Sequence, residues 1–237
     1  MAERTEALVV QHTPGGGPGR WAGWLAEGGL DLRVVHAYAG EPLPGRLDHA
    51  ALLVLGGAYL PDDDDRAPWL APTRGLVRDA LDRETPMVGI CLGGQLLATV
   101  AGGAVRAEHG EPEFGSTRLT LRAEAADDPL FHGLPTHPPA IENHVDAIVR
   151  LPEGARWLAR SERCPHQAFR VGAAAWGVQF HPESSPERIA DWSTERLERH
   201  GVDRDELRRR ATADAAALTE VWREVALRFA ALVRKRG

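Results

Sequence analysis

Cysteine is scarce in this chain, whose 237 residues include only two, Cys91 and Cys164. Two cysteines do not build a disulfide framework, so we expect reduced thiols and a cytoplasmic protein. Long apolar runs are also missing, because none approaches the length that a membrane helix needs. The opening stretch MAERTEALVV has no basic start followed by an apolar core, which argues against a secretory signal. The sequence therefore predicts no membrane partner.

Basic residues are outnumbered by acidic ones, 28 to 34, which gives a formal net charge of -6. A nucleic acid partner would require a clustered basic face, so none is predicted. Of the ten histidines, the eight other than His144 and His181 show no metal-ligand spacing, and no glycine-rich loop ends in Lys-Ser or Lys-Thr. We therefore expect neither a metal site nor a phosphate-binding loop. The acidic run from Asp62 to Asp65 is interpreted as a solvated loop.

The first half of the chain contains an alternation of apolar runs with helical patterns. The run at residues 51–57 is apolar almost throughout, as a central parallel strand should be. The predicted strands cover residues 7–13, 32–38, 51–57 and 86–90, and the predicted helices cover 21–29, 67–84 and the segment after Cys91. This alternation predicts a parallel sheet covered by helices on both faces.

The second half contains shorter apolar runs separated by Pro, Gly and Asp turns. They predict strands of an antiparallel or mixed section at residues 116–124, 140–145, 155–162, 167–172 and 174–183. From Pro186 onward the pattern is helical, and residues 202–237 form either one long helix or a broken pair. We therefore divide the chain into an α/β domain at residues 1–200 and a helical extension packed on it at residues 201–237.

A single cysteine stands where a short apolar strand turns into a helix. Gly89 and Gly93 flank Cys91, and small residues there permit the tight turn of a nucleophile elbow. The helix that follows points its N-terminus at the thiol, which favours the thiolate. Free backbone N–H groups at that end, including that of Leu92, can hold an oxyanion. Cys164 has no such turn and is interpreted as a core or loop residue.

A cysteine nucleophile needs a base, and the base needs a group that orients it. His181 and Glu183 stand two positions apart at the end of the last predicted strand, which places them on one side of an extended chain. Pro182 between them stiffens the exit from the strand. Either residue alone would be interpreted as an ordinary surface residue. In a chain that also carries the cysteine elbow, they predict a catalytic triad with Cys91.

Paired glycines, Gly56 and Gly57, end the predicted strand at residues 51–57. Ligand sites of open α/β sheets lie beyond the carboxyl ends of the strands. Glycines at that edge let backbone N–H groups approach a substrate closely. A plain strand-to-loop turn is the alternative, and the elbow and the histidine in the same chain favour the site.

Three motifs in this order resemble the class I glutamine amidotransferases: VLGG at residues 54–57, GICLGGQLLA at 89–98 and GVQFHPE at 177–183. The stretches DDDDRAPWL, EFG and DDPLFHGLP are similar to the stand-alone branch that looks like the amidotransferase part of GMP synthase. The resemblance runs from about Ala7 to Glu187. It implies a flavodoxin-like α/β fold with a mixed, mostly parallel central sheet and helices on both faces.

The resemblance implies a role for each matching residue. Cys91 would be the nucleophile, His181 the base and Glu183 its orienting group. Gly57 and Leu92 match the backbone donors of the oxyanion hole. The implied substrate-binding residues are Gly56, Gln95, Asn143, His144, Val145 and Asp146.

Two positions depart from the pattern of the family. Ala58 stands where proline often follows the paired glycines, and this leaves the loop freer to rotate. Val145 stands where glycine usually follows the histidine, and a β-branched side chain restricts the backbone there. The first difference concerns the shape of the oxyanion hole, and the second concerns the fit to free glutamine. A structural role for His144 is the alternative to substrate contact.

The activity implied by the resemblance is attack of the Cys91 thiolate on a γ-carboxamide, followed by hydrolysis of a γ-glutamyl thioester. No metal or organic cofactor takes part. In the first interpretation the released ammonia serves a separate synthase partner. In the second, a stand-alone hydrolase or peptidase acts on another γ-glutamyl small molecule. A non-catalytic regulatory or scaffold protein is the third, and the complete triad argues against it.

Overall fold

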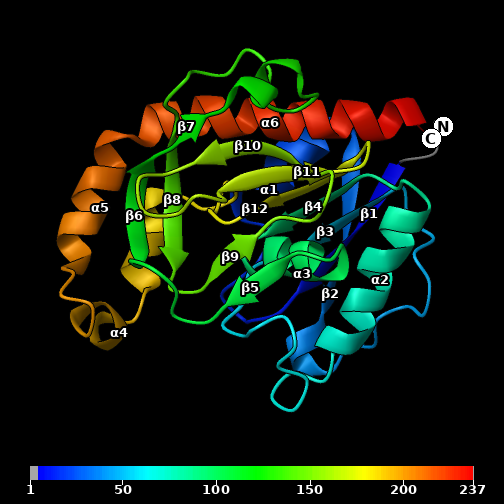
Figure 1. Cartoon of the computed structure of the whole chain (residues 1–237), viewed down its shortest axis with the longest axis horizontal. Helices are drawn as coiled ribbons and strands as arrows, with labels where there is room; N and C mark the ends of the chain where they lie inside the picture. Colours follow the sequence, from blue (N-terminus) through cyan, green and yellow to red (C-terminus); the bar gives the residue numbers. More distant parts are fainter. Residues whose placement is uncertain (1–4, 237) are drawn as a thin grey trace.

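A central eight-stranded sheet organises the protein, whose computed structural model describes residues 5–236 (Figure 1). The start of the opening stretch that is expected to carry no secretory signal lies outside the described residues. The strands are β1 (Thr5–Gln11), β2 (Leu30–His36), β3 (Ala51–Val54), β4 (Met87–Ile90), β5 (Ala104–Arg106), β6 (Glu113–Arg118), β7 (Thr120–Leu121), β8 (Pro139–His144), β9 (Ala147–Arg150), β10 (Arg156–Arg160), β11 (Ala168–Val171) and β12 (Ala175–Val178). The helices are α1 (Gly19–Glu27), α2 (Leu70–Asp82), α3 (Leu92–Val100), α4 (Thr194–Glu198), α5 (Arg204–Ala213) and α6 (Ala215–Arg236).

The strands of this sheet run in the order β2-β1-β3-β4-β12-β11-β10-β7. Neighbours from β2 to β12 pair in parallel, and neighbours from β12 to β7 pair antiparallel. The sheet is therefore mixed, with its parallel part formed mainly by the first half of the chain, and the predicted fold class is confirmed.

Side chains of the parallel strands alternate between two hydrophobic cores, one on each face of the sheet. In β1, Ala7 and Val9 belong to one core, and Leu8 and Val10 belong to the other. The helices α1 and α6 pack over the first face, and α2 and α3 pack over the second (Figure 1). The prediction of helices on both faces is confirmed.

The helix α6 runs along one face of the sheet for 22 residues. Its Trp222 Nε1 donates a hydrogen bond of 2.9 Å to the carbonyl of Pro139 in β8. The Trp222 ring also packs on Phe180, with ring centroids 4.6 Å apart. This helix therefore supports the segment that leads from β12 to His181, and it shares its core with α1 and β1. The division of the chain at residue 200 stays a prediction.

Of the two alternatives for residues 202–237, the structure contains the broken pair. The helices α5 and α6 are separated at Asp214, whose carboxylate accepts hydrogen bonds from Ser116 and Arg118 of β6, at 2.7 and 2.5 Å. This contact ties the junction of the two helices to β6. No helix among residues 5–236 is both long enough and apolar enough to span a bilayer.

Several predicted strands were too long, and the errors bear on the site. The strand expected at residues 51–57 ends at Val54, so Gly56 and Gly57 lie in the loop beyond it. The strand expected at residues 174–183 ends at Val178, so His181 also lies in a loop. Both loops leave the carboxyl edge of the parallel strands, the edge where such sheets bind ligands.

Two small sheets lie beside the main one. The strand β6 pairs antiparallel with β8, in a register that sets Glu113 opposite His144 and Phe114 opposite Asn143. The strand β5 pairs antiparallel with β9, and neither of these two strands was predicted. The expected strand at residues 116–124 is interrupted at Leu119, which separates β6 from β7.

Candidate active site

Cys91 occupies a strained turn between β4 and α3. Its φ of 51° and ψ of -107° lie in a region that side-chain-bearing residues rarely adopt. A Cβ atom at Gly93 would lie 1.9 Å from the carbonyl oxygen of Val54, and one at Gly89 would lie 2.3 Å from the carbonyl oxygen of Gly93. Only glycine fits at these two positions. The turn therefore has the tight geometry of a nucleophile elbow.

His181 and Glu183 lie together in the loop after β12. The Nδ1 atom of His181 donates a hydrogen bond of 2.8 Å to the Oε1 atom of Glu183, whose side chain is buried. The backbone N–H of His181 donates to the carbonyl of Ile141 in β8, at 2.7 Å. Burial of the ring disfavours the imidazolium, but Glu183 and Cys91 outweigh it and raise the pKa of His181 well above its ordinary value. The ring is thus oriented and holds its proton firmly.

A cleft of about 670 Å³ brings these groups together at the carboxyl edge of the parallel strands. Cys91, His181 and Glu183 line it, and so do Gly56 and Gly57. Its volume falls in the range of small-molecule sites. Five residues predicted from separate motifs therefore meet at one cavity.

The two predicted oxyanion donors are Leu92, which follows Cys91 directly, and Gly57, which packs against the Leu92 side chain. Leu92 is the first residue of α3, so its N–H has no carbonyl partner within the helix. Gly57 is packed closely, because a Cβ atom there would lie 2.9 Å from both the His12 and the Leu92 side chains. The N–H of Cys91 is already used, since it donates to the carbonyl of Val178 at 2.8 Å.

A pair of buried glutamines lies behind Cys91. The Nε2 atom of Gln179 donates to the Cys91 sulfur at 3.7 Å, and Gln95 Nε2 donates to Gln179 Oε1 at 3.2 Å. Gln95 is not among the residues that line the cleft, and Gln179 lies between it and Cys91. Sequence reasoning missed Gln179, although it stands in the GVQFHPE motif two positions before His181.

The predicted substrate segment divides between two environments. Asn143 lines the cleft, whereas His144 is buried and points to the other side of β8. The Nδ1 atom of His144 donates to the carbonyl of Asp146 at 3.1 Å. Val145 has no positive φ, so its β-branched side chain is compatible with the backbone here. Neither Val145 nor Asp146 lines the cleft.

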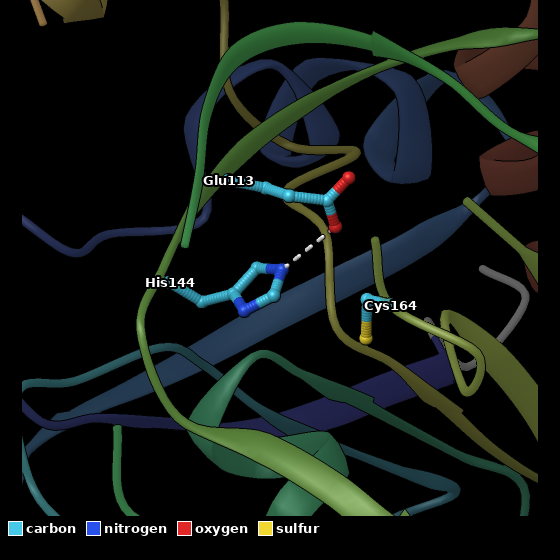
Figure 2. A group of neighbouring side chains, drawn as sticks. All are labelled: Glu113, His144 and Cys164. Carbon is cyan, nitrogen blue, oxygen red and sulfur yellow. Dashed lines mark hydrogen bonds and ion pairs between the residues drawn. The ribbon is translucent and has the colours of Figure 1, made fainter. Parts of the chain in front are cut away.

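His144 belongs to a buried polar cluster, shown in part in Figure 2. We define this cluster as Glu113, Glu142, His144, Ser161, Cys164 and Gln167. The Nε2 atom of His144 lies 3.3 Å from a Glu113 oxygen and 3.4 Å from a Glu142 oxygen. Ser161 and Gln167 donate to the same Glu113 oxygen, at 2.9 and 2.7 Å. The cluster thus ties β6, β8 and the loop before β11 together.

The positive charge of this polar cluster is carried by His144. Burial disfavours the imidazolium, but the hydrogen bonds to Glu113 and Glu142 outweigh it and raise the pKa of His144 to about 10. Burial raises the pKa of Glu142 to about 7. Donor atoms of Glu113, His144 and Cys164 lie within 4.8 Å of one another, a grouping that sequence spacing did not reveal. Burial and the two glutamates raise the pKa of the Cys164 thiol, so it stays protonated.

Two further parts of the cleft wall were missed. The glycine-rich turn after β1, at residues 13–17 and 19, lines the cleft. Its position after a parallel strand was a signal that could have revealed it. Arg196 of α4 also lines the cleft, and no motif marks this residue. It reaches the site only because the chain returns after β12 and passes over Asn143.

Curated proteins that resemble this chain include glutamine-hydrolyzing GMP synthases. GMP synthase (glutamine-hydrolyzing) of Porphyromonas gingivalis is 46% identical to the chain over 103 residues, which are 41% of this chain and 19% of that protein. A glutamine-hydrolyzing GMP synthase subunit of Archaeoglobus fulgidus is 40% identical over 101 residues, which are 42% of this chain and 53% of that protein. The chain thus spans about half the length, or less, of these relatives.

Comparisons with solved structures fit the fold. A glutamine amidotransferase of Thermotoga maritima superposes with a TM-score of 0.86 at 24% identity, covering 96% of this chain and 99% of that one. A glutamine amidotransferase of Methylobacillus flagellatus superposes with a TM-score of 0.83 at 26% identity, covering 95% and 94%. The sequence pattern of the family described as glutamine amidotransferase class-I matches residues 25–192. This match extends over most of the chain, which therefore belongs to the class I glutamine amidotransferase family.

Proposed function

We propose that this protein hydrolyses the γ-carboxamide of glutamine with Cys91, His181 and Glu183 as its catalytic triad. The observation that carries the proposal is the convergence of these three side chains on one cleft. The elbow presents the cysteine, and the 2.8 Å hydrogen bond fixes the histidine ring. Membership of the glutamine amidotransferase family supports glutamine as the substrate.

Each step of the proposed reaction uses a group of this cleft. The Cys91 thiolate attacks the amide carbon while His181 holds the proton, and the oxyanion accepts hydrogen bonds from the N–H groups of Gly57 and Leu92. His181 then protonates the departing nitrogen, and ammonia leaves a γ-glutamyl thioester on Cys91. Water that gives up a proton to His181 attacks the thioester, which releases glutamate and restores the thiol.

The test is release of ammonia and glutamate from glutamine by the purified protein. A glutamine-like diazo-ketone is expected to add one mass label, at Cys91, and to abolish turnover. The matched control is Cys164→Ala, which is expected to keep both labelling and turnover because that thiol is buried away from the cleft. Labelling of Cys164, or unchanged turnover in Cys91→Ala, would contradict the triad.

The proposed fate of the ammonia is transfer to a separate synthase. The support is that relatives such as the Archaeoglobus fulgidus protein are named as one subunit of a GMP synthase. Ala58, exposed beside Gly57 on the cleft wall, lacks the ring with which a proline would fix φ, and we infer that the peptide between these two residues can turn out of line although Gly57 itself is closely packed. Loss of one oxyanion donor costs about 100- to 1000-fold in turnover.

We therefore expect low glutaminase activity in the isolated protein and a rise, chiefly in kcat, when a synthase partner is present. The measurement is steady-state kinetics with and without that partner. Ordinary enzymes have kcat/KM values on the order of 10⁴ M⁻¹s⁻¹ or more. Such a value for glutamine in the absence of a partner would contradict the expectation that the isolated protein has low activity.

A stand-alone γ-glutamyl hydrolase is the second candidate function. The observation that favours it is the size of the cleft, because about 670 Å³ lies in the range that holds drug-sized ligands. Such a volume accommodates a leaving group larger than ammonia. This candidate predicts full activity of the isolated protein on a γ-glutamyl amine and weak activity on glutamine, which the same kinetic measurements distinguish.

A further inference from the structure

We propose that Arg196 binds the α-carboxylate of the substrate, so that the cleft selects γ-glutamyl compounds whose α-carboxylate is free. The inference rests on the proposed function, because it names a determinant of substrate choice in the same cleft. Arg196 belongs to α4 and lines the cleft together with Cys91 and Asn143. Neither the sequence motifs nor the implied substrate segment includes it.

The guanidinium of Arg196 is held in one orientation. Its Nη1 atom donates a hydrogen bond of 2.7 Å to the Oδ1 atom of Asn143, and its Cζ atom lies 5.3 Å from the centroid of the Phe114 ring. Phe114 and Asn143 are themselves paired across β6 and β8. The backbone is fixed as well, since the N–H of Arg196 donates to the Ser193 side chain that caps α4. An oriented donor loses little entropy when it binds an anion.

The charge of Arg196 has no carboxylate partner within ion-pair distance among residues 5–236. The other cleft arginine, Arg188, lies 3.5 Å from Asp191. Arg196 is half-buried, and burial lowers its pKa, with a smaller effect of Arg199 in the same direction and opposing effects of Cys91 and Asp146. A half-buried cation whose hydrogen-bonding partner is a neutral amide is best compensated by an anion that enters with the ligand.

Glutamine itself carries such an anion, its α-carboxylate. The scissile amide lies at one end of the molecule and the α-carboxylate at the other, so one cavity must hold both. With Nη1 directed to Asn143, the remaining N–H groups of the guanidinium fork are left for a carboxylate. A γ-glutamyl residue whose α-carboxylate is blocked, as in the interior of a peptide, would lose this interaction.

The test compares two substrates on matched variants. L-glutamine carries the α-carboxylate, and L-glutamine α-amide replaces it with a neutral group. We expect Arg196→Gln to lower kcat/KM for glutamine by about 10- to 150-fold, the range of a hydrogen bond to a charged group. The loss should lie in KM, because the interaction is equal in ground state and transition state. Turnover of the α-amide should change less than about threefold, so the preference for glutamine collapses.

The control is Arg199→Gln, which changes an exposed arginine at the end of the same helix outside the cleft and should keep the preference. Arg196→Lys retains a charge and should keep part of the preference, which covers the case in which Arg196→Gln does not fold. Equal losses on both substrates, or an unchanged preference in Arg196→Gln, would overturn the inference.

Equilibrium binding separates this inference from the proposed reaction. Calorimetry measures the affinity of L-glutamine for Cys91→Ala and for Cys91→Ala with Arg196→Gln. Weaker binding in the second variant supports the carboxylate site even if the wild-type protein does not turn glutamine over, a result that would count against the proposed function alone. No binding to Cys91→Ala, or equal binding to both variants, overturns the carboxylate site.

Discussion

Replacing Glu183 by glutamine removes the charge that faces His181 and keeps the shape of the side chain. In the wild type, His181 Nδ1 lies 2.8 Å from the Oε1 atom of Glu183. The amide oxygen of the glutamine can still accept this hydrogen bond, so the ring keeps its orientation and tautomer. A hydrogen bond to a charged group contributes about 1.5–3 kcal/mol in total, and the substitution removes only the part of this energy that comes from the charge. At 1.36 kcal/mol for each tenfold change, we expect kcat to fall by at most about 10- to 150-fold.

The pH dependence gives the more specific result. Glu183 and Cys91 hold the pKa of His181 well above its ordinary value, against the opposing effect of burial. A group whose pKa is raised in this way loses its proton at a lower pH once its carboxylate partner is neutral. The alkaline limb of the kcat/KM profile of Glu183→Gln is therefore expected to shift to lower pH.

The assay is ammonia release from glutamine across the pH range, with a thermal melt to show that the variant folds. His181→Ala is the comparison variant, and its loss should be larger, about 100- to 10,000-fold for removal of a general acid–base. Wild-type kcat in Glu183→Gln, or an alkaline limb that does not move, would refute the role of Glu183 as the group that orients and charges His181.

Three other perturbations test the surroundings of the triad. Gly93→Ala should destabilise the fold by about 3 kcal/mol or more, the upper end of the cost of overpacking, because the new Cβ atom would lie 1.9 Å from the Val54 carbonyl oxygen. Urea unfolding measures this loss. The control is Gly75→Ala, whose Cβ atom would meet nothing within 4 Å and which should not destabilise the fold. Gln179→Leu removes the donor to the Cys91 sulfur and should lower the rate of alkylation by a diazo-ketone more than it lowers the melting temperature. The pKa of His144 is raised from 6.5 to about 10, so its stabilising effect is complete below pH 6.5 and is lost as the pH rises toward 10. The unfolding free energy of His144→Asn should thus decline less steeply between pH 7 and 10 than that of the wild type. An equally steep decline would show that the titration of His144 does not cause the pH dependence.

The parallel half of the sheet could be predicted because its strands are buried on both faces. All four residues of β3 and all four of β4 are buried, so they read as continuous apolar runs. The strands β5 and β9 were missed because they have only three and four residues and partly exposed side chains. Too few positions remain there for an alternating pattern to emerge.

The proposed nucleophile and base could be picked out in the sequence because the pattern that marks them is local. The elbow depends on Gly89 and Gly93, each two positions from Cys91, and the pair of His181 and Glu183 spans two positions. Contacts between distant segments gave no such signal. Arg196 meets Asn143 across 53 residues of sequence. A single sequence contains no pattern that joins positions so far apart.

The strand β8 links the buried polar cluster to the candidate site. Its Ile141 carbonyl accepts the backbone N–H of His181, and its Asn143 side chain accepts from Arg196. Because side chains alternate along a strand, His144 points away from the cleft into the buried polar cluster. Burying two glutamates around one imidazolium is costly in free energy, and such charges add to specificity of structure more readily than to stability. Here they surround the end of β8, the strand that holds the proposed base through Ile141 and the proposed carboxylate-binding arginine through Asn143.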